Sequence, residues 1–402
     1  MNMKTKNYFL IAAIIVLSSL YLANGCNEDP SSLYDPKAST GATPLISTFS
    51  PSDSGLAGVT DFTISGSNFT TDISKITVFF DAHTGKILQA TSTQLIVRAP
   101  LLVKDTVNVK ISVQGAMSFS NEKKVKLKSA VVLFDSIKSQ EEPWGVAIDA
   151  QGNLYVSLNA NGVKQFTPSG VRTNFTPNAS PLGSKLDVMK FSPLDGKMYA
   201  VWGLNAIAIL PGNNATGQLW VPMPNQNKPK SFDFDGDGNI WAAGTNGTDT
   251  NNAIVRVTPT KNIATFPLGG GAIRSMKVLN GYLYLAGTMK DSTEKVVRYK
   301  IVNKDTLGSQ EVIFNLSSVA NSTGKLIYAM VFTAQGDMLL GTNLTNPILK
   351  VSNGVASVFY PDVFAPSFQV LTWGTGTQLW GVRVNSVGNK LYKIDTQIMG
   401  QP

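Results

Sequence analysis

Six residues of contrasting chemistry recur at intervals of roughly 43 residues through the second part of the chain. They are Trp144, Asp187, Lys230, Arg274, Tyr328 and Gln369. If the repeat brings them together, the two cations can hold an anionic group, the carboxylate can orient it and the aromatic rings can stack on a sugar or similar ring. This combination favours an acidic sugar or another anionic ligand. The alternative interpretation is that their mixed polarity reflects only exposure to solvent.

A second candidate is a run of alternating aspartates, Asp233, Asp235 and Asp237, followed by Gly238. This is the opening spacing of a calcium loop, in which alternate carboxylates surround a hard cation. The twelfth position of such a loop is Gly244, where a bidentate glutamate is needed. The segment also coincides with a turn of the repeat described below. We therefore predict a structural hairpin without a metal or cofactor, and keep Ca²⁺ as the alternative.

Nucleophilic catalysis has few candidate residues in this sequence. The only histidine is His83 and the only cysteine is Cys26, and both precede residue 129. Residues 129–402 therefore lack a nucleophile–histidine pair and the thiolates of a soft-metal site. We expect a binding function rather than an enzymatic one.

Cys26 follows a segment typical of exported proteins. Lys4 and Lys6 precede an apolar run over residues 8–23, which is shorter than the roughly 20 residues of a membrane span. Residues 22–26 resemble a lipobox, although Ala23 stands where leucine is usual. The resemblance implies a lipoprotein signal peptide at 1–25 and a lipid on Cys26 that anchors the protein to the membrane. An uncleaved anchor or an ordinary signal peptide is the alternative.

The residues after Cys26 bear on location. Glu28 and Asp29 resemble the acidic export signal of Bacteroidetes lipoproteins, which implies the outer membrane and its outer face. Few apolar residues and many Ser, Pro, Thr and Gly follow, so residues 26–43 are predicted to be a flexible tether. The formal charge of +8 comes without a long basic run, and we expect no nucleic-acid partner.

The remainder of the chain is predicted to be all-β and to form two domains. Short apolar runs rich in Val, Ile, Phe and Tyr are bounded by turn formers, among them 35 glycines and 20 prolines. Residues 62–69, 76–80, 94–100 and 107–113 indicate strands. Together with the opening Pro44-Leu45-Ile46 and Ser50-Pro51, they resemble an IPT/TIG domain, which implies an immunoglobulin-like β-sandwich at 44–128. For this domain a spacer role is favoured over binding.

Residues 129–402 contain six strand–turn–strand repeats. Each turn has a glycine, at positions 152, 196, 238, 281, 336 and 376, as hairpins with positive φ require. A period near 43 residues with about four strands is typical of a β-propeller blade. The units resemble NHL or gluconolactonase-like repeats, which implies six blades. Residues 130–135 are expected to complete the last blade and close the ring.

In such a ring, the six recurring residues would surround the mouth of the central channel. Positions four residues later are expected to pack between blades, since they are uniformly apolar: Ile148, Phe191, Phe234, Val278, Phe332 and Trp373. The sequence thus predicts a non-catalytic surface lipoprotein that binds a glycan, another polymer or a protein. The alternative that the propeller resemblance implies is a lactonase-like or other hydrolase dependent on a divalent metal.

Overall fold

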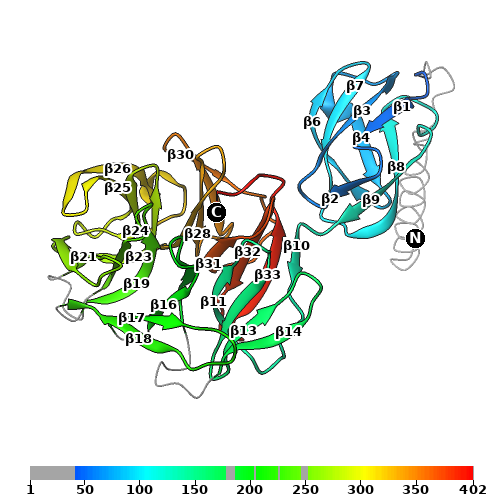
Figure 1. Ribbon diagram of the computed structural model, residues 1–402. Coiled ribbons are helices and arrows are strands. Elements are labelled where there is room, and N and C mark those ends of the chain that lie inside the picture. The colour runs from blue at the N-terminus through cyan, green and yellow to red at the C-terminus, as the bar shows by residue number, and fades with distance from the viewer. Residues whose placement is uncertain (1–40, 178–185, 203–204, 225–226, 246–251, 402) are drawn as a thin grey trace, which may run out of the picture.

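The computed structural model describes residues 41–177, 186–202, 205–224, 227–245 and 252–401. These residues form strands and short 3-10 turns, the latter at η1 (Ile73–Lys75) and η4 (Leu316–Ser318). None of the helices among them is long and apolar enough to cross a membrane. Figure 1 shows the first group of strands in blue and cyan and the remaining strands in green to red.

The first group of strands forms a two-sheet sandwich. One sheet has the order β1 (Leu45–Ser50), β3 (Asp61–Ser67), β7 (Gln94–Arg98) and β6 (Lys86–Ala90). The other has the order β2 (Ser54–Leu56), β9 (Lys123–Lys128), β8 (Lys104–Val113), β4 (Ile76–Phe80) and β5 (His83–Thr84). The alternation predicted for β8 is observed, since Val107, Val109 and Ile111 are fully buried between the sheets.

Residues just before Pro44, the predicted first residue of the sandwich, also contact it. Gly41 bridges to Ala116, and the Gly41 N–H donates to the Gly115 carbonyl at 2.7 Å. Gly41 and Thr43, which lie in the predicted tether, therefore contact the sandwich, the latter through the Ser118 hydroxyl at 3.0 Å.

The second group comprises six four-stranded sheets in the described part of the chain, which we number as blades one to six. Blade one is β11 (Pro143–Ile148), β12 (Leu154–Leu158), β13 (Gly162–Phe166) and β14 (Arg172–Thr176). Blade two is β15 (Met189–Phe191), β16 (Met198–Trp202), β17 (Ala206–Leu210) and β18 (Gln218–Pro222). Blade three is β19 (Lys228–Phe234), β20 (Ile240–Thr245), β21 (Ala253–Val257) and β22 (Ile263–Pro267).

Blades four to six complete the propeller. Blade four is β23 (Ala272–Leu279), β24 (Tyr282–Thr288), β25 (Glu294–Asn303) and β26 (Thr306–Asn315). Blade five is β27 (Ile327–Phe332), β28 (Met338–Thr342), β29 (Ile348–Ser352) and β30 (Val355–Val358). Blade six is β31 (Phe368–Trp373), β32 (Gln378–Arg383), β33 (Lys390–Asp395) and, from the start of the domain, β10 (Val131–Leu133).

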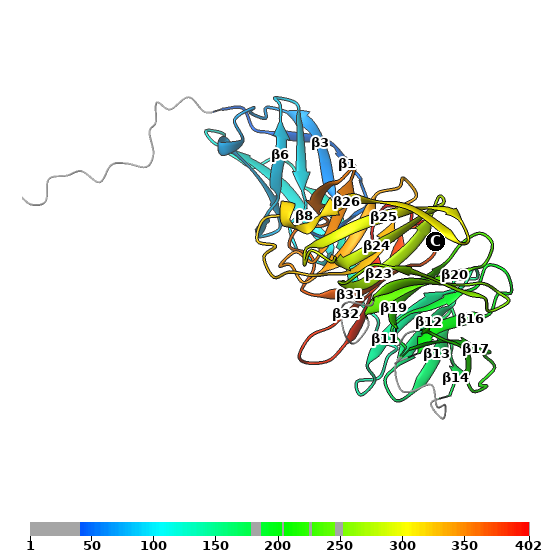
Figure 2. The same cartoon turned by 90° about the vertical axis from the view of Figure 1, so that its left-hand side faces the viewer.

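The ring closes as the sequence predicts. β10 pairs antiparallel with β33, through Val131 with Ile394 and Leu133 with Tyr392. Six hydrophobic clusters lie between consecutive blades, and the last of them joins blade six to blade one. The six hairpin glycines have positive φ values of 65° to 88°, as their predicted turns require. Figure 2 shows the same strands turned by 90° about the vertical axis.

Aromatic side chains pack between several neighbouring blades. The rings of Tyr155 in blade one and Phe191 in blade two pack edge to face with their centres 5.0 Å apart. The rings of Tyr199 in blade two and Phe234 in blade three do the same, with their centres 5.5 Å apart. The Trp373 indole donates to the Phe332 carbonyl at 2.6 Å, which joins blades five and six. These apolar positions therefore pack between blades, as the sequence predicts.

Candidate ligand-binding channel

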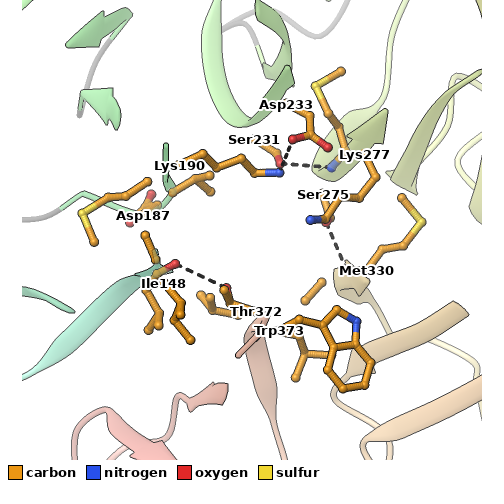
Figure 3. A pocket seen from close by; sticks show the side chains of 18 of the residues that line it. Ile148, Asp187, Lys190, Ser231, Asp233, Ser275, Lys277, Met330, Thr372 and Trp373 are labelled. Carbon is orange, nitrogen blue, oxygen red and sulfur yellow. Dashed lines mark hydrogen bonds and ion pairs between the residues drawn. The ribbon is translucent and has the colours of Figure 1, made fainter. Parts of the chain in front are cut away.

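A cavity of about 300 Å³ lies where the first strands of the six blades meet. All six first strands, or the residues directly before them, contribute to its lining. Figure 3 shows side chains from these strands pointing into a common space. Two sets of equivalent positions supply most of the polar groups, and we call them the outer ring and the inner ring.

The outer ring consists of the six residues that the sequence singles out. Asp187, Arg274, Tyr328 and Gln369 line the cavity. Lys230 and Trp144 occupy equivalent positions in their blades but do not line it. Lys230 forms an ion pair at 3.5 Å with Asp187, which does line the cavity.

Irregular pairing explains how outer-ring side chains turn away from the sheets. The pairing of five of the six first strands with their neighbours shifts, at Lys230, Arg274, Tyr328 and Gln369 and in blade one over residues 144–145, whereas Asp187 lies just before β15. A bulge leaves one residue out of the ladder and redirects its side chain. The sequence repeat thus aligned these five bulge positions without revealing that they are bulges.

Arg274 is committed to protein partners. Its guanidinium pairs with Glu294, and its Nε donates to the Ile327 carbonyl at 2.7 Å. It also donates to the Thr288 hydroxyl at 3.2 Å and lies 5.8 Å from the centre of the Tyr328 ring. The Arg274 and Glu294 side chains are only 18% and 11% exposed, so the pair is largely buried. A neutralised arginine with these contacts has little capacity left for an anionic ligand.

Asp187 retains more binding capacity. Its Oδ2 faces the Lys230 ammonium, but both side chains are partly exposed. Its Oδ1 is buried and has no hydrogen-bond partner among the described residues. A buried oxygen without a partner is costly and is well placed to accept a hydrogen bond from a ligand hydroxyl.

The inner ring lies three residues further along each first strand. Its members are Ala147, Lys190, Asp233, Lys277, Val331 and Thr372. Lys190 Nζ pairs with Asp233 Oδ1 at 2.6 Å, and Asp233 Oδ2 accepts the Val278 N–H at 2.9 Å. Figure 3 shows Lys190, Asp233 and Lys277 gathered on one side of the cavity, opposite Thr372 and Trp373.

Burial and charge act together on this cluster. Burial lowers the pKa of Lys190 to about 7, against the opposing effect of Asp233 and with a further lowering by Lys277. Burial alone would raise the pKa of Asp233, but the charges of Lys190 and Lys277 lower it below its usual value. Asp233 is therefore ionised at neutral pH, and Lys190 exchanges its proton near neutrality.

Sequence reasoning missed the inner ring. Lys190, Asp233 and Lys277 each stand one residue before an apolar position that the repeat had already aligned. Charged residues at equivalent places in three successive blades were a usable signal. Charges that alternate with apolar residues in a strand normally face solvent, so this pattern alone does not indicate a channel.

Apolar groups form the rest of the wall. Met189, Met276 and Met330 occupy equivalent positions between the two rings and line the cavity. Methionine adapts its shape to a ligand more readily than branched side chains do. The cavity therefore offers both polar groups and an adaptable apolar surface.

Residues near the C-terminus contribute to the cavity wall on the side of Trp373. Gln401 lines the cavity, and its N–H donates to the Phe332 carbonyl at 2.9 Å. Gly400 lies so close to Trp373 that a Cβ there would be 2.2 Å from the indole ring.

The alternating aspartates occupy two different environments. Asp233 faces the channel, whereas Asp235 accepts from the Asp237 and Asn239 N–H groups at 3.1 and 2.9 Å and from the Trp241 indole at 2.8 Å. Asp149 holds the equivalent turn of blade one in the same way, through Asn153 and Tyr155. These contacts are those of a structural hairpin.

The donor set of the channel does not fit a divalent metal. Asp187 and Asp233, the carboxylates that line the cavity, each have a lysine partner. Across the described ranges, no three His, Cys, Asp or Glu side chains converge as a metal site needs. The lipidation predicted at Cys26 lies outside the described residues.

Comparison with known proteins identifies the first domain. Residues 44–126 match the IPT/TIG domain family, an immunoglobulin-like sandwich. No curated protein matches the chain.

Solved structures from Bacteroides resemble nearly the whole chain. A Bacteroides thetaiotaomicron protein provisionally described as a phosphatase is 11% identical, with a TM-score of 0.55 over 90% of this chain and 99% of its own. An auxiliary nutrient binding protein from the same species is 13% identical, with a TM-score of 0.44 over 90% and 98%. Another from Bacteroides ovatus is 12% identical, with a TM-score of 0.44 over 90% and 99%. At such low identity the likeness concerns the fold alone.

Proposed function

We propose that this protein is a non-catalytic, lipid-anchored binding protein of the cell surface, and that its propeller channel holds a small polar ligand such as one unit of a glycan. The observation that carries the proposal is the cavity between the two rings. Its volume of about 300 Å³ is at the lower end of the range for ligand pockets. A space of this size suits a single sugar-sized group better than a stretch of polymer.

The groups around the cavity support binding rather than catalysis. Ser231 and Ser275, two hydroxyls that line the cavity, accept backbone N–H groups of the next blade at 3.0 and 3.1 Å. No histidine or cysteine occurs in residues 129–402 to activate them. The metal-dependent hydrolase would need converging carboxylates, and the channel carboxylates are instead paired with lysines.

Blocking the channel tests its role. Val370 is half-buried and lines the cavity, so we expect Val370→Trp to fill the space and weaken binding by about tenfold or more, as a clash in a pocket does. The measurement is titration calorimetry against a panel of mono- and oligosaccharides, with circular dichroism to verify folding.

Val302→Trp is the matched control, because Val302 is 56% exposed and lies on β25, away from the cavity. It should bind as the unmodified protein does. If a panel member binds and Val370→Trp leaves its affinity unchanged, the ligand site is not the channel.

The anchor is tested separately in cells. Cys26→Ala should release the protein from membranes and abolish incorporation of labelled palmitate, since the thiol is the predicted lipid acceptor. Protease added to intact cells should cleave the anchored protein if it faces outward. Continued palmitate labelling of Cys26→Ala would refute the lipoprotein assignment, and full protease protection would place the protein in the periplasm.

A further inference from the structure

We infer that the channel ligand carries a single carboxylate, and that this group lies against Lys277 beside the Lys190–Asp233 pair. The inference rests on the proposed function, because it names the chemical class that the channel selects. It also places the acidic group at the inner ring rather than on Arg274.

The first argument is the charge balance of the inner ring. Two lysines share one aspartate, and Lys190 holds that aspartate at 2.6 Å. Lys277 lies close enough to act on both charges of the pair, yet no carboxylate of the described residues is within 4.0 Å of its ammonium. When Lys190 is protonated, the cluster therefore carries one positive charge in excess, and this charge faces the cavity.

The other charged groups that line the cavity do not offset this charge. Asp187 is balanced by Lys230, and Arg274 is balanced by Glu294. Tyr328, Gln369 and Thr372 contribute only neutral polar groups at neutral pH. With Lys190 protonated, the excess of one positive charge at Lys277 is thus the excess of the whole lining.

The size of the excess selects among anions. A carboxylate carries one negative charge at neutral pH, whereas a phosphate monoester carries about 1.5 to 2. A carboxylate neutralises Lys277 completely, while a phosphate ester would leave negative charge beside Asp233. The methionine wall and the buried Asp187 oxygen suit the remaining part of a sugar acid, which presents both C–H surface and hydroxyls.

Binding of a carboxylate at Lys277 should also change the protonation of Lys190. Lys190 titrates near neutrality because burial and Lys277 oppose its charge. A carboxylate seated on Lys277 favours protonation of Lys190 and raises its pKa. Binding of the acid near pH 8 should therefore take up protons.

The experiment is calorimetric titration with four probes, D-glucuronate, D-galacturonate, D-glucose and D-galactose. The proteins are the unmodified chain, Lys277→Met and Lys300→Met. Lys300 is exposed and lies on β25 of the same blade, so it is the matched control. We expect at least one uronate to bind and both neutral sugars to bind at least about tenfold more weakly, as loss of a charge-assisted hydrogen bond predicts.

Lys277→Met should reduce the preference for the uronate to less than about twofold, whereas Lys300→Met should retain it. Repeating the titration near pH 8 in two buffers of different ionisation enthalpy should reveal proton uptake that is lost in Lys190→Met. Equal binding of acids and neutral sugars, or an acid preference that survives Lys277→Met, overturns the inference.

The outcomes separate this inference from the proposed function. If neutral sugars bind as tightly as the uronates, and Val370→Trp abolishes this binding, the channel function is supported and the inference of a carboxylate ligand is rejected. Failure of all four probes at their highest soluble concentrations would reject the carboxylate class at this site. The wider glycan panel would still decide whether the channel binds at all.

Discussion

Glu294→Gln is expected to lower the free energy of unfolding by about 3 kcal/mol, because it leaves the Arg274 charge buried without its partner. The two side chains are 18% and 11% exposed, so water can replace little of the lost interaction. Glu294 also accepts the Ile327 N–H at 2.9 Å, and Arg274 donates to the Ile327 carbonyl. The pair thereby joins blade four to the first strand of blade five.

The measurement is denaturant unfolding at neutral pH, followed by circular dichroism and tryptophan fluorescence. Glu311→Gln is the matched control in the same blade. Glu311 pairs with Arg298 at 2.7 Å, but these side chains are 45% and 30% exposed. Its loss should cost at most about 1 kcal/mol, as for other surface pairs.

A double variant, Arg274→Met/Glu294→Met, should recover much of the stability, since it removes both charges together. If Glu294→Gln were as stable as the unmodified protein, Arg274 would not depend on Glu294. The arginine would then be available to a ligand, as the sequence repeat alone suggested.

The repeat predicted the scaffold well because the features that define it are local. Hairpin glycines, alternating β-branched residues and apolar positions between blades each follow from a few neighbouring residues. The left-handed φ of Gly152 or Gly336 and the burial of Phe332 are examples. The fourth strand of blade four, β26, was less visible, because it lies between the hairpin glycines at 281 and 336, where the spacing departs most from 43 residues.

The polar contacts of the channel could not be predicted because they join distant residues. Glu294 lies on the third strand of its blade, and no spacing rule relates it to Arg274. The pairing of Lys190 with Asp233 crosses from blade two to blade three. In addition, neighbouring blades cover both faces of a first strand, so alternation there no longer separates core from solvent. Lys190 and Lys277 were consequently not recognised as channel residues.

The second large expected effect is a rise in stability with pH that depends on Lys190. Burial lowers the pKa of this lysine in the folded protein to about 7, from 10.5 for an unperturbed lysine. Between these values the unfolded chain holds a proton that the folded protein has released. Stability therefore increases with pH through this window, and Lys190 contributes no slope below it.

Asp233 does not obscure this effect. Its folded pKa is lowered from 3.8, mainly by the lysine charges against the effect of burial. Its contribution to stability is present above the unfolded pKa and is lost only as the pH falls through the lower folded value. That window is acidic and does not overlap with the window of Lys190.

Denaturant unfolding at several pH values between about 6.5 and 9 should reveal the slope, which approaches about 1.4 kcal/mol per pH unit in the middle of the Lys190 window. Lys190→Met removes the titrating group, and Lys277 remains beside Asp233 to balance its charge. This variant should therefore fold and show a nearly flat profile. The exposed-lysine variant Lys300→Met should keep the slope of the unmodified protein.

Parallel profiles for Lys190→Met and the unmodified protein would mean that Lys190 keeps an ordinary pKa in the channel. The proton uptake expected on binding would then be lost as well, whereas the charge excess at Lys277 would grow, because both lysines would stay protonated around one aspartate.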